Sequence, residues 1–405
     1  MMKWILRTVI VLAILAVLAV VINWSTFQRL RAVETVFDAD KIVENFSHMD
    51  RMFLHQYLEI GDTPHVWPED IQPLPTTVTV AGRERNLAEL LETLQTTALV
   101  IIRGGTLIHE SYYHGTDRDD LRISWSVAKS FVSGLYGPVL ESGAIGNLND
   151  TVEIYVPEMT GTAYEGVTLR NLLNMASGVR FSEDYMDPES DIIKIGRILG
   201  LGQSLDKFAT SIEGREHEPG VVWKYVSMDT HVAAMALRRA TGKSLHQLFY
   251  ETYGSNLGFG RAPYYLTDGK NVALALGGLN LRTRDYAKFG QLFLQNGQWR
   301  GEQIIPSNWV AESTQHTAPT MAESDMGYGY QWWVPMPQEG IHRGDVFAVG
   351  MYGQYVYVNP RLGIVIAKNA THHKFAEPIE GFDHSRNLTI EMFRSLSGQL
   401  ANMDQ

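Results

Sequence analysis

The sequence predicts an α/β fold of the α+β kind, in which an antiparallel sheet is flanked by helices and carries an inserted helical domain. Three observations lead to this prediction. Two strand patterns occur early, within 98–113, and three occur late, within 346–368, while the segment from about 147 to 258 is mostly helical. The strand runs are rich in β-branched and aromatic residues. A sheet assembled from both ends of the chain, with helices packed against it, accommodates this order.

Composition narrows the class of protein. The chain has 405 residues, of which 45% are hydrophobic and 20% are charged, so it is long enough for two domains or one large domain with an insertion. The net charge of −11, with no long basic run, argues against a nucleic-acid partner. The absence of cysteine excludes disulfides, a thiol nucleophile and thiolate metal ligands. We expect neither a metal site nor a cofactor.

The N-terminus predicts a membrane segment. Lys3 and Arg7 precede an apolar run from Thr8 to Ile22, and Trp24 follows it. We expect residues 1–27 to form a single-pass anchor in the cytoplasmic membrane, with the rest of the chain outside, in the periplasm. A cleaved signal peptide, which would release a secreted protein, and a buried core helix are the alternatives. The residues after the run are a poor cleavage context, which favours the anchor.

Between the anchor and the main domain we expect a connecting region over 28–90, punctuated by four prolines and holding one or two helical turns. The main domain is expected over 91–402. It starts with a strand pair joined at Gly104-Gly105, a favoured hairpin turn. Further helices are predicted at 87–95, 168–175, 232–240, 284–295 and 385–400.

The most informative stretch is Ser126-x-x-Lys129 at the start of an apolar helical pattern. A serine and a lysine three residues apart share one face of a helix. A serine hydroxyl needs a base to become a nucleophile, and burial can lower the pKa of a lysine enough for that task. The motif alone is weak, because Ser204 and Lys207 repeat it. We interpret the second copy as a capped helix start, with Ser204 as N-cap.

Two further stretches could complete a site. Tyr225-x-Ser227 follows a Pro-Gly turn, and a tyrosine near a cation can shuttle protons. Gly350-Met351 opens a C-terminal strand, where glycine permits close approach and backbone N–H groups could bind an oxyanion. Taken singly, each stretch has an ordinary explanation. Tyr225 would be a common aromatic residue at a loop–helix junction, and Gly350-Met351 would form a β-bulge or a turn.

The ordered combination of these three stretches resembles the serine β-lactamase-like superfamily, which includes class C β-lactamases, penicillin-binding proteins and related esterases and amidases. Residues 172–185 and 350–354 make the chain most similar to the 6-aminohexanoate-dimer hydrolase type. The resemblance runs from about Leu94 to Leu396. It implies a β-lactamase/transpeptidase-like fold with the helical insertion described above.

The resemblance also implies a role for each residue that matches the family's motifs. Ser126 would be the acylating nucleophile, Lys129 its base and Tyr225 the proton relay to the leaving group. The N–H groups of Ser126 and Met351 would form the oxyanion hole. The expected substrate-binding residues are Tyr185, Ser227 and Gly350.

The expected function is therefore that of a serine hydrolase, an amidase or esterase acting on a small-molecule ester or amide through an acyl-enzyme on Ser126. The alternative is a membrane-anchored, penicillin-binding or cell-wall-associated protein with weak or no hydrolase activity. The family's third motif, usually Lys-Thr-Gly or His-Thr-Gly, corresponds here to Ala348-Val349-Gly350. Because the cation that pairs with a β-lactam carboxylate is missing from it, we expect poor β-lactam turnover.

Overall fold

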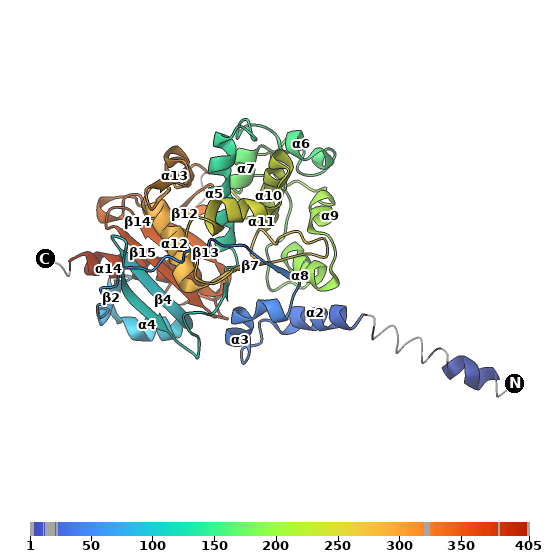
Figure 1. The fold of residues 1–405 in the computed structure, drawn as a ribbon, viewed down its shortest axis with the longest axis horizontal. Coiled ribbons are helices and arrows are strands. Elements are labelled where there is room, and N and C mark those ends of the chain that lie inside the picture. Colours follow the sequence, from blue (N-terminus) through green and yellow to red (C-terminus); the bar gives the residue numbers. More distant parts are fainter. Residues whose placement is uncertain are drawn as a thin grey trace.

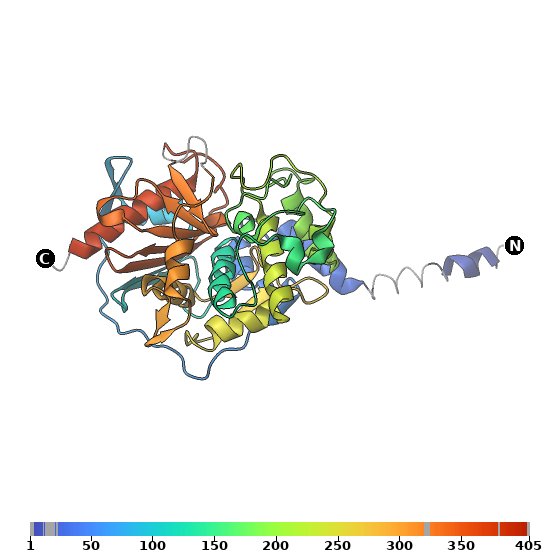
Figure 2. The same cartoon turned by 90° about the horizontal axis from the view of Figure 1, so that it is seen from above.

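The computed structural model describes residues 4–10, 12, 21, 23–319, 325–379 and 381–402. The main body has two lobes that lie side by side (Figure 1, Figure 2). One lobe is built on a large sheet, and the other is mostly helical. Helix α5 (Val127–Glu141) lies between them, with its N-terminus at the junction. The candidate nucleophile therefore lies where the two lobes meet.

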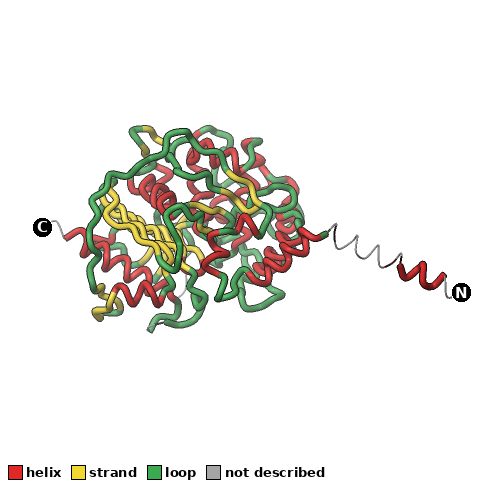
Figure 3. Tube along the Cα trace, turned by 60° about the horizontal axis from the view of Figure 1, so that its bottom comes forward, coloured by secondary structure: helices red, strands yellow, loops and turns green. Residues whose placement is uncertain are grey.

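The large sheet has seven antiparallel strands in the order β11-β12-β13-β14-β15-β4-β5. The N-terminal pair β4 and β5 thus adds to one edge of β15, as the early and late strand patterns predicted. The strands are β4 (Thr96–Arg103), β5 (Thr106–Tyr112), β11 (Met326–Gly329), β12 (Trp332–Pro335), β13 (Val346–Gly350), β14 (Gln354–Asn359) and β15 (Ile364–Ala370). The strands and the red helices around them are visible in Figure 3.

Both faces of this sheet are covered, because successive side chains of a strand point to opposite faces. In β4, Leu99 and Ile101 belong to the core beneath the C-terminal helix α14 (Ser385–Asn402). Val100 and Ile102 belong to the other core, which includes α12 (Thr283–Leu294) and α5. The predicted fold class is confirmed: a mixed structure of helices around an antiparallel sheet.

The helical lobe contains most of the elements predicted between the strand groups. Thr168 and Ser204 cap their helices as expected, accepting hydrogen bonds from the N–H groups of Asn171 and Lys207. The elements are α6 (Val152–Tyr155), η2 (Pro157–Met159), α7 (Leu169–Leu173), α8 (Asp191–Leu201), α9 (Leu205–Thr210), α10 (Ser227–Thr241), α11 (Leu245–Phe249) and η3 (Tyr250–Gly254). Helix α10 begins five residues before the predicted 232, which places Ser227 in its first turn.

The segment before the main domain holds more regular structure than the sequence indicated. It contains α2 (Trp24–Thr35), α3 (Ile42–Ser47), η1 (Met49–Arg51), β1 (His55–Tyr57), β2 (Thr77–Val80), β3 (Arg83–Asn86) and α4 (Leu87–Thr93). Strand β1 joins a four-stranded sheet with β7 (Tyr264–Leu266), β8 (Leu279–Leu281) and β6 (Arg122–Ile123). Helix α2 packs on α8 at the lower edge of the helical lobe (Figure 1).

Five short elements complete the fold. They are a two-stranded sheet of β9 (Gln298–Trp299) and β10 (Glu302–Gln303), helix α13 (Ser307–Ser313) and the 3-10 turns η4 (Gly340–His342) and η5 (Met351–Gly353). Of the predicted anchor, residues 1–3, 11, 13–20 and 22 lie outside those described. Within the described ranges, no helix is long and apolar enough to cross a membrane.

Candidate active site

Ser126 occupies the N-cap position of α5, directly before the first helical residue. The helix is apolar on nearly all sides: Val127, Ala128 and Phe131 are fully buried, as expected for a helix that runs through a core. Ser126 makes no capping hydrogen bond with its side chain. Its hydroxyl is therefore available for chemistry, at a helix end whose free N–H groups favour negative charge.

Lys129 lies one turn into α5 and is 1% exposed. Its Nζ donates to the Ser227 hydroxyl at 3.1 Å and to the Leu276 carbonyl at 2.9 Å. Burial lowers the pKa of Lys129 from 10.5 to about 8, although the negative charge of Glu183 opposes the shift. The ammonium form is disfavoured because it has lost water without gaining a direct carboxylate partner. A neutral amine, which can accept a proton, is thus populated at mildly alkaline pH.

Tyr225 lies beside the candidate nucleophile, because both residues line the same pocket. The Lys129 Nζ lies 5.3 Å from the centre of the tyrosine ring. Burial raises the pKa of Tyr225 well above 10, and the nearby Ser126 hydroxyl only partly opposes this rise. The phenol is therefore protonated at neutral pH, so it is a proton donor rather than a resting base.

Glu183 is a site residue that the sequence did not reveal, although it lies within a stretch that carries the resemblance. Its carboxylate accepts hydrogen bonds from the N–H and the hydroxyl of Ser227 and from the Tyr185 hydroxyl, the latter at 3.1 Å. Burial raises the pKa of Glu183. The Ser227 hydroxyl thus bridges Lys129 and Glu183, so Ser227 and Tyr185, both expected to bind substrate, also belong to a charged network.

The end of β13 lies directly against the chain at Ser126. A Cβ added to Gly350 would lie 2.4 Å from the Ser124 carbonyl oxygen and 3.2 Å from the Ser126 nitrogen, so only glycine fits. Neither the Ser126 nor the Met351 N–H takes part in a turn, cap or side-chain hydrogen bond of the described residues. The two N–H groups that are predicted to bind the oxyanion are therefore not used by any turn, cap or side chain of the described residues.

Two residues next to these donors have left-handed backbones without being glycine. Trp125 has a φ of 42° and Tyr352 a φ of 58°. Such conformations cost about 1–3 kcal/mol each and require support from their surroundings. Phe37, just after α2, stacks on Tyr352 at 4.9 Å between ring centres and contacts Trp125 at 5.7 Å. Phe46 of α3 packs against both rings. The N-terminal segment thus supports both strained residues.

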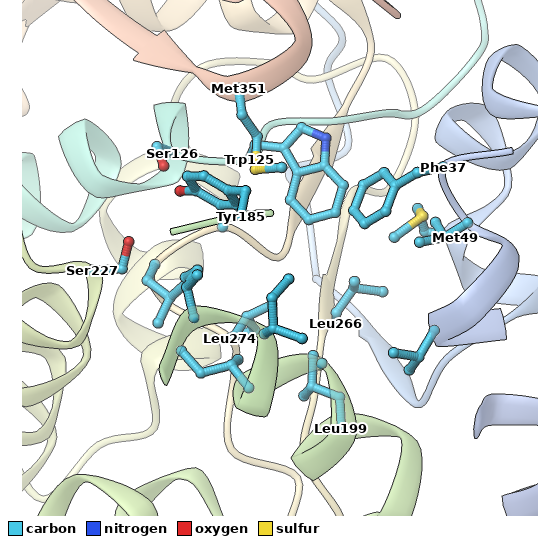
Figure 4. A pocket seen from close by; sticks show the side chains of 18 of the residues that line it. Phe37, Met49, Trp125, Ser126, Tyr185, Leu199, Ser227, Leu266, Leu274 and Met351 are labelled. Atoms are coloured by element: carbon cyan, nitrogen blue, oxygen red, sulfur yellow. The ribbon is translucent and has the colours of Figure 1, made fainter. Parts of the chain in front are cut away.

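Two pockets meet at Ser126. We call the first the apolar pocket; it has a volume of about 220 Å³, and Figure 4 shows its side chains around Ser126. It is lined by Val33, Val36, Phe37, Met49, Phe53, Trp125, Ser126, Tyr185, Ile192, Ile193, Ile195, Gly196, Leu199, Ser227, Leu266, Leu274, Leu276, Gly277, Met351 and Tyr352. Ser126, Tyr185, Met351 and Tyr352 also line the second pocket.

The second, which we call the mixed pocket, has a volume of about 350 Å³. It is lined by Ser126, Glu183, Tyr185, Trp223, Tyr225, Trp333, Val349, Gly350, Met351, Tyr352, Gly353, Tyr355, Phe375, Ala376, His384, Ser385 and Arg386. Ala348, at the cation position of the third motif, carries no charge, and its neighbour Val349 lines this pocket. A cation comes instead from the start of α14, where the Arg386 guanidinium lies 4.4 Å from the centre of a Trp333 ring. Sequence analysis missed Arg386 because it lies 36 positions after the end of the motif.

Comparisons with known proteins agree with this architecture. The sequence model of the Beta-lactamase family matches residues 84–381. A 6-aminohexanoate-dimer hydrolase from Paenarthrobacter ureafaciens is 28% identical over 313 residues, which cover 73% of this chain and 78% of that protein. The structure of a candidate 6-aminohexanoate-dimer hydrolase from Bacillus anthracis superposes with a TM-score of 0.80 at 26% identity, covering 91% of this chain and 97% of the other.

More distant structures share the fold. EstCE1, a hydrolase with promiscuous acyltransferase activity, has a TM-score of 0.56 at 18% identity, with 77% of this chain and 98% of that chain covered. An octameric penicillin-binding protein homologue from Pyrococcus abyssi has a TM-score of 0.55 at 18% identity, with 78% and 76% covered. With the family match over residues 84–381, the chain belongs to the beta-lactamase family and is a hydrolase related to 6-aminohexanoate-dimer hydrolase.

Proposed function

We propose that this protein is a serine hydrolase that cleaves an ester or amide bond of a small substrate through an acyl-enzyme on Ser126. One observation carries the proposal. The Ser126 hydroxyl opens onto two pockets, lies beside Tyr225 and shares the first turn of α5 with a buried lysine whose pKa is lowered to about 8. Nucleophile, base and proton donor are thus within one small site.

In the first step, the Ser126 oxygen attacks the substrate carbonyl carbon and its proton passes to the neutral amine of Lys129. The carbonyl oxygen becomes an oxyanion, which the N–H groups of Ser126 and Met351 stabilise. The bond to the leaving oxygen or nitrogen then breaks, and that atom takes a proton from the Tyr225 phenol. Lys129 returns its proton to Tyr225, directly or through water. Water, activated by the same base, then releases the acid and restores Ser126.

The hydrogen bonds around Lys129 support its role as base. In the resting site its Nζ donates to Ser227 and Leu276 rather than to Ser126. Ser227 in turn donates to Glu183 at 3.2 Å. Before the reaction, burial favours the neutral amine of Lys129. Once Lys129 has taken up a proton, the nearby Glu183 carboxylate stabilises the positive charge.

A labelling experiment tests the proposal. A fluorophosphonate should form a stable adduct on Ser126, located by mass spectrometry, and p-nitrophenyl esters should be turned over. Short ω-amino amides, suggested by the name of the Paenarthrobacter ureafaciens relative, and nitrocefin belong in the same panel. We expect ester turnover and little nitrocefin turnover, because Ala348, at the cation position of the family's third motif, carries no charge. No adduct and no turnover of any substrate would support a binding protein instead.

We also propose that residues near Thr8 to Trp24 hold the protein on the outer face of the cytoplasmic membrane. Trp24 and Phe27 support this, because their rings are 51% and 57% exposed and aromatic side chains favour the membrane interface. The full-length protein should sediment with membranes and resist a carbonate wash. N-terminal sequencing that finds a soluble mature form starting after Ala19 would contradict the anchor.

A further inference from the structure

The apolar pocket has a composition that restricts what can bind beside Ser126. None of its lining side chains carries a charge, and its polar groups belong to residues of the site or next to it: Trp125, Ser126, Tyr185, Ser227 and Tyr352. Figure 4 shows Leu199, Leu266 and Leu274 opposite Ser126, with Phe37 and Met49 closing one side. Such a cavity favours hydrocarbon and disfavours any group that must lose water without gaining a partner.

The N-terminal segment supplies one wall of this pocket. Val33 of α2 and Val36 directly after it, together with Phe37, Met49 and Phe53, line it. These residues precede the stretch that matches the family, which starts at residue 84. The wall is fixed in place because α2 sits closely on α8: the Arg29 Nε donates to the Gly200 carbonyl at 3.1 Å. A Cβ on Gly200 would lie 3.0 Å from a Leu30 methyl group.

The position of Tyr225 decides which half of the substrate enters which pocket. Tyr225 lines the mixed pocket and is absent from the apolar pocket. Because the leaving atom must come within reach of the proton donor, the leaving group lies in the mixed pocket. The acyl group, bonded to the other side of the same carbonyl carbon, then extends into the apolar pocket.

We propose that the apolar pocket selects an uncharged, apolar acyl group, such as a medium-length aliphatic chain, and that it rejects an acyl chain with a terminal ammonium. This inference rests on the proposed hydrolase function and narrows its substrate class. An ammonium at the end of the chain would be surrounded by residues such as Val33, Ile195 and Leu199, with no carboxylate among the lining residues to pair with it.

Two matched substrate comparisons test the inference on the full-length protein. In p-nitrophenyl esters from acetyl to decanoyl, kcat/KM should rise roughly fourfold for each methylene added until the pocket is filled, and then fall. The heptanoyl ester should exceed the 6-aminohexanoyl ester by about 100-fold or more, since the two acyl chains have the same length and differ in the terminal charge. A flat length series or equal turnover of that pair would overturn the inference.

Variants of Val33 locate the effect. Val33→Trp should fill the pocket and lower the ratio of octanoyl to acetyl kcat/KM by about 10-fold or more. Val33→Asp should shift the heptanoyl to 6-aminohexanoyl ratio toward the charged substrate. Glu34→Trp is the matched control, because Glu34 is the next residue of α2 and is exposed to solvent; both ratios should stay at the wild-type values. Ratios unaffected by both Val33 variants would contradict the assigned wall.

Failure of this inference can be told apart from failure of the proposed function. If the acetyl ester is hydrolysed and fluorophosphonate labels Ser126, but chain length has no effect, only the acyl selectivity is wrong. If no ester is hydrolysed and Ser126 is not labelled, the hydrolase proposal itself fails. Circular dichroism of each Val33 variant separates loss of fold from loss of selectivity.

Discussion

The apolar pocket and the mixed pocket share Ser126 but differ in origin and chemistry. The apolar pocket takes its walls from α2, α8 and the chain around 266–277, and its lining is uncharged. The mixed pocket takes its walls from β13, the start of α14 and residues 223–225, and it contains Glu183 and Arg386. Hydrophobic burial is non-directional and scales with area, whereas charges and proton donors act at fixed positions.

This difference indicates that the two halves of a substrate are recognised by different physical means. The acyl half is selected by length and by absence of charge. The leaving half is selected by what can approach Tyr225 and Arg386, and it is where proton delivery occurs. Variants should therefore separate into those that affect every substrate, those that depend on the leaving group and those that depend on neither pocket.

The largest effect is expected at the atom that both pockets share. Ser126→Ala should abolish turnover of every substrate, whichever pocket binds it more tightly, because no covalent intermediate can form. Steady-state assays with an ester and an amide, on protein whose fold is verified by circular dichroism, check this. Residual turnover near the wild-type rate would mean that the acyl-enzyme assignment is wrong.

Tyr225→Phe removes the proton donor on the mixed-pocket side. We expect amide turnover to fall by roughly 10²–10⁴-fold, the scale of a positioned acid–base group. The loss should be smaller for p-nitrophenyl esters, since p-nitrophenolate leaves as a stable anion and needs no proton. Comparing the two kcat/KM losses measures the difference. Equal losses would show that Tyr225 does not deliver the proton to the leaving group.

The pH dependence reports on Lys129, which serves both pockets equally. The neutral amine is the active form and its pKa is about 8, so kcat/KM should rise roughly tenfold per pH unit below pH 8 and level off above it. The rising part of the pH profile should have the same midpoint for short and long acyl esters. A midpoint near the ordinary lysine value of 10.5 would show that the ammonium is not destabilised in the active enzyme.

A moderate effect is expected from Arg386, which affects only the mixed pocket. Burial lowers the pKa of its guanidinium, and no acidic residue among the described ones forms an ion pair with it. Arg386→Gln should lower the kcat/KM ratio of acyl esters of 4-hydroxybenzoate to those of 4-hydroxybenzamide by about 10-fold. An unaltered ratio would exclude Arg386 from binding leaving-group carboxylates.

The smallest effect is expected outside both pockets, at the second Ser-x-x-Lys match. Ser204 accepts a hydrogen bond from the Lys207 N–H at 3.3 Å as the cap of α9. Ser204→Ala should lower the free energy of unfolding by about 1 kcal/mol, measured by denaturant titration, while turnover by the folded protein is unchanged. If this variant were inactive and Ser126→Ala active, the site would have been assigned to the wrong motif.

Much of the fold and the central part of the site follow from local sequence signals. Strand and helix patterns predicted the sheet with its early and late strands, because burial on alternate faces leaves a visible period. Gly104-Gly105, Thr168 and Ser204 act where predicted, because turns and caps depend on nearby residues. Ser126, Lys129, Tyr225 and Met351 line one site, as the order of their motifs implied.

The tertiary structure alone decided the contacts between segments distant in the sequence. Glu183 reaches Lys129 through Ser227, and Arg386 enters the pocket from the last helix; neither pairing has a local signature. The lowered pKa of Lys129 depends on burial by many segments at once. The N-terminal segment, which the sequence presents as a connection, becomes a pocket wall because Phe37 packs on Tyr352 more than 300 positions away. Such packing depends on shape in three dimensions, which a linear pattern does not encode.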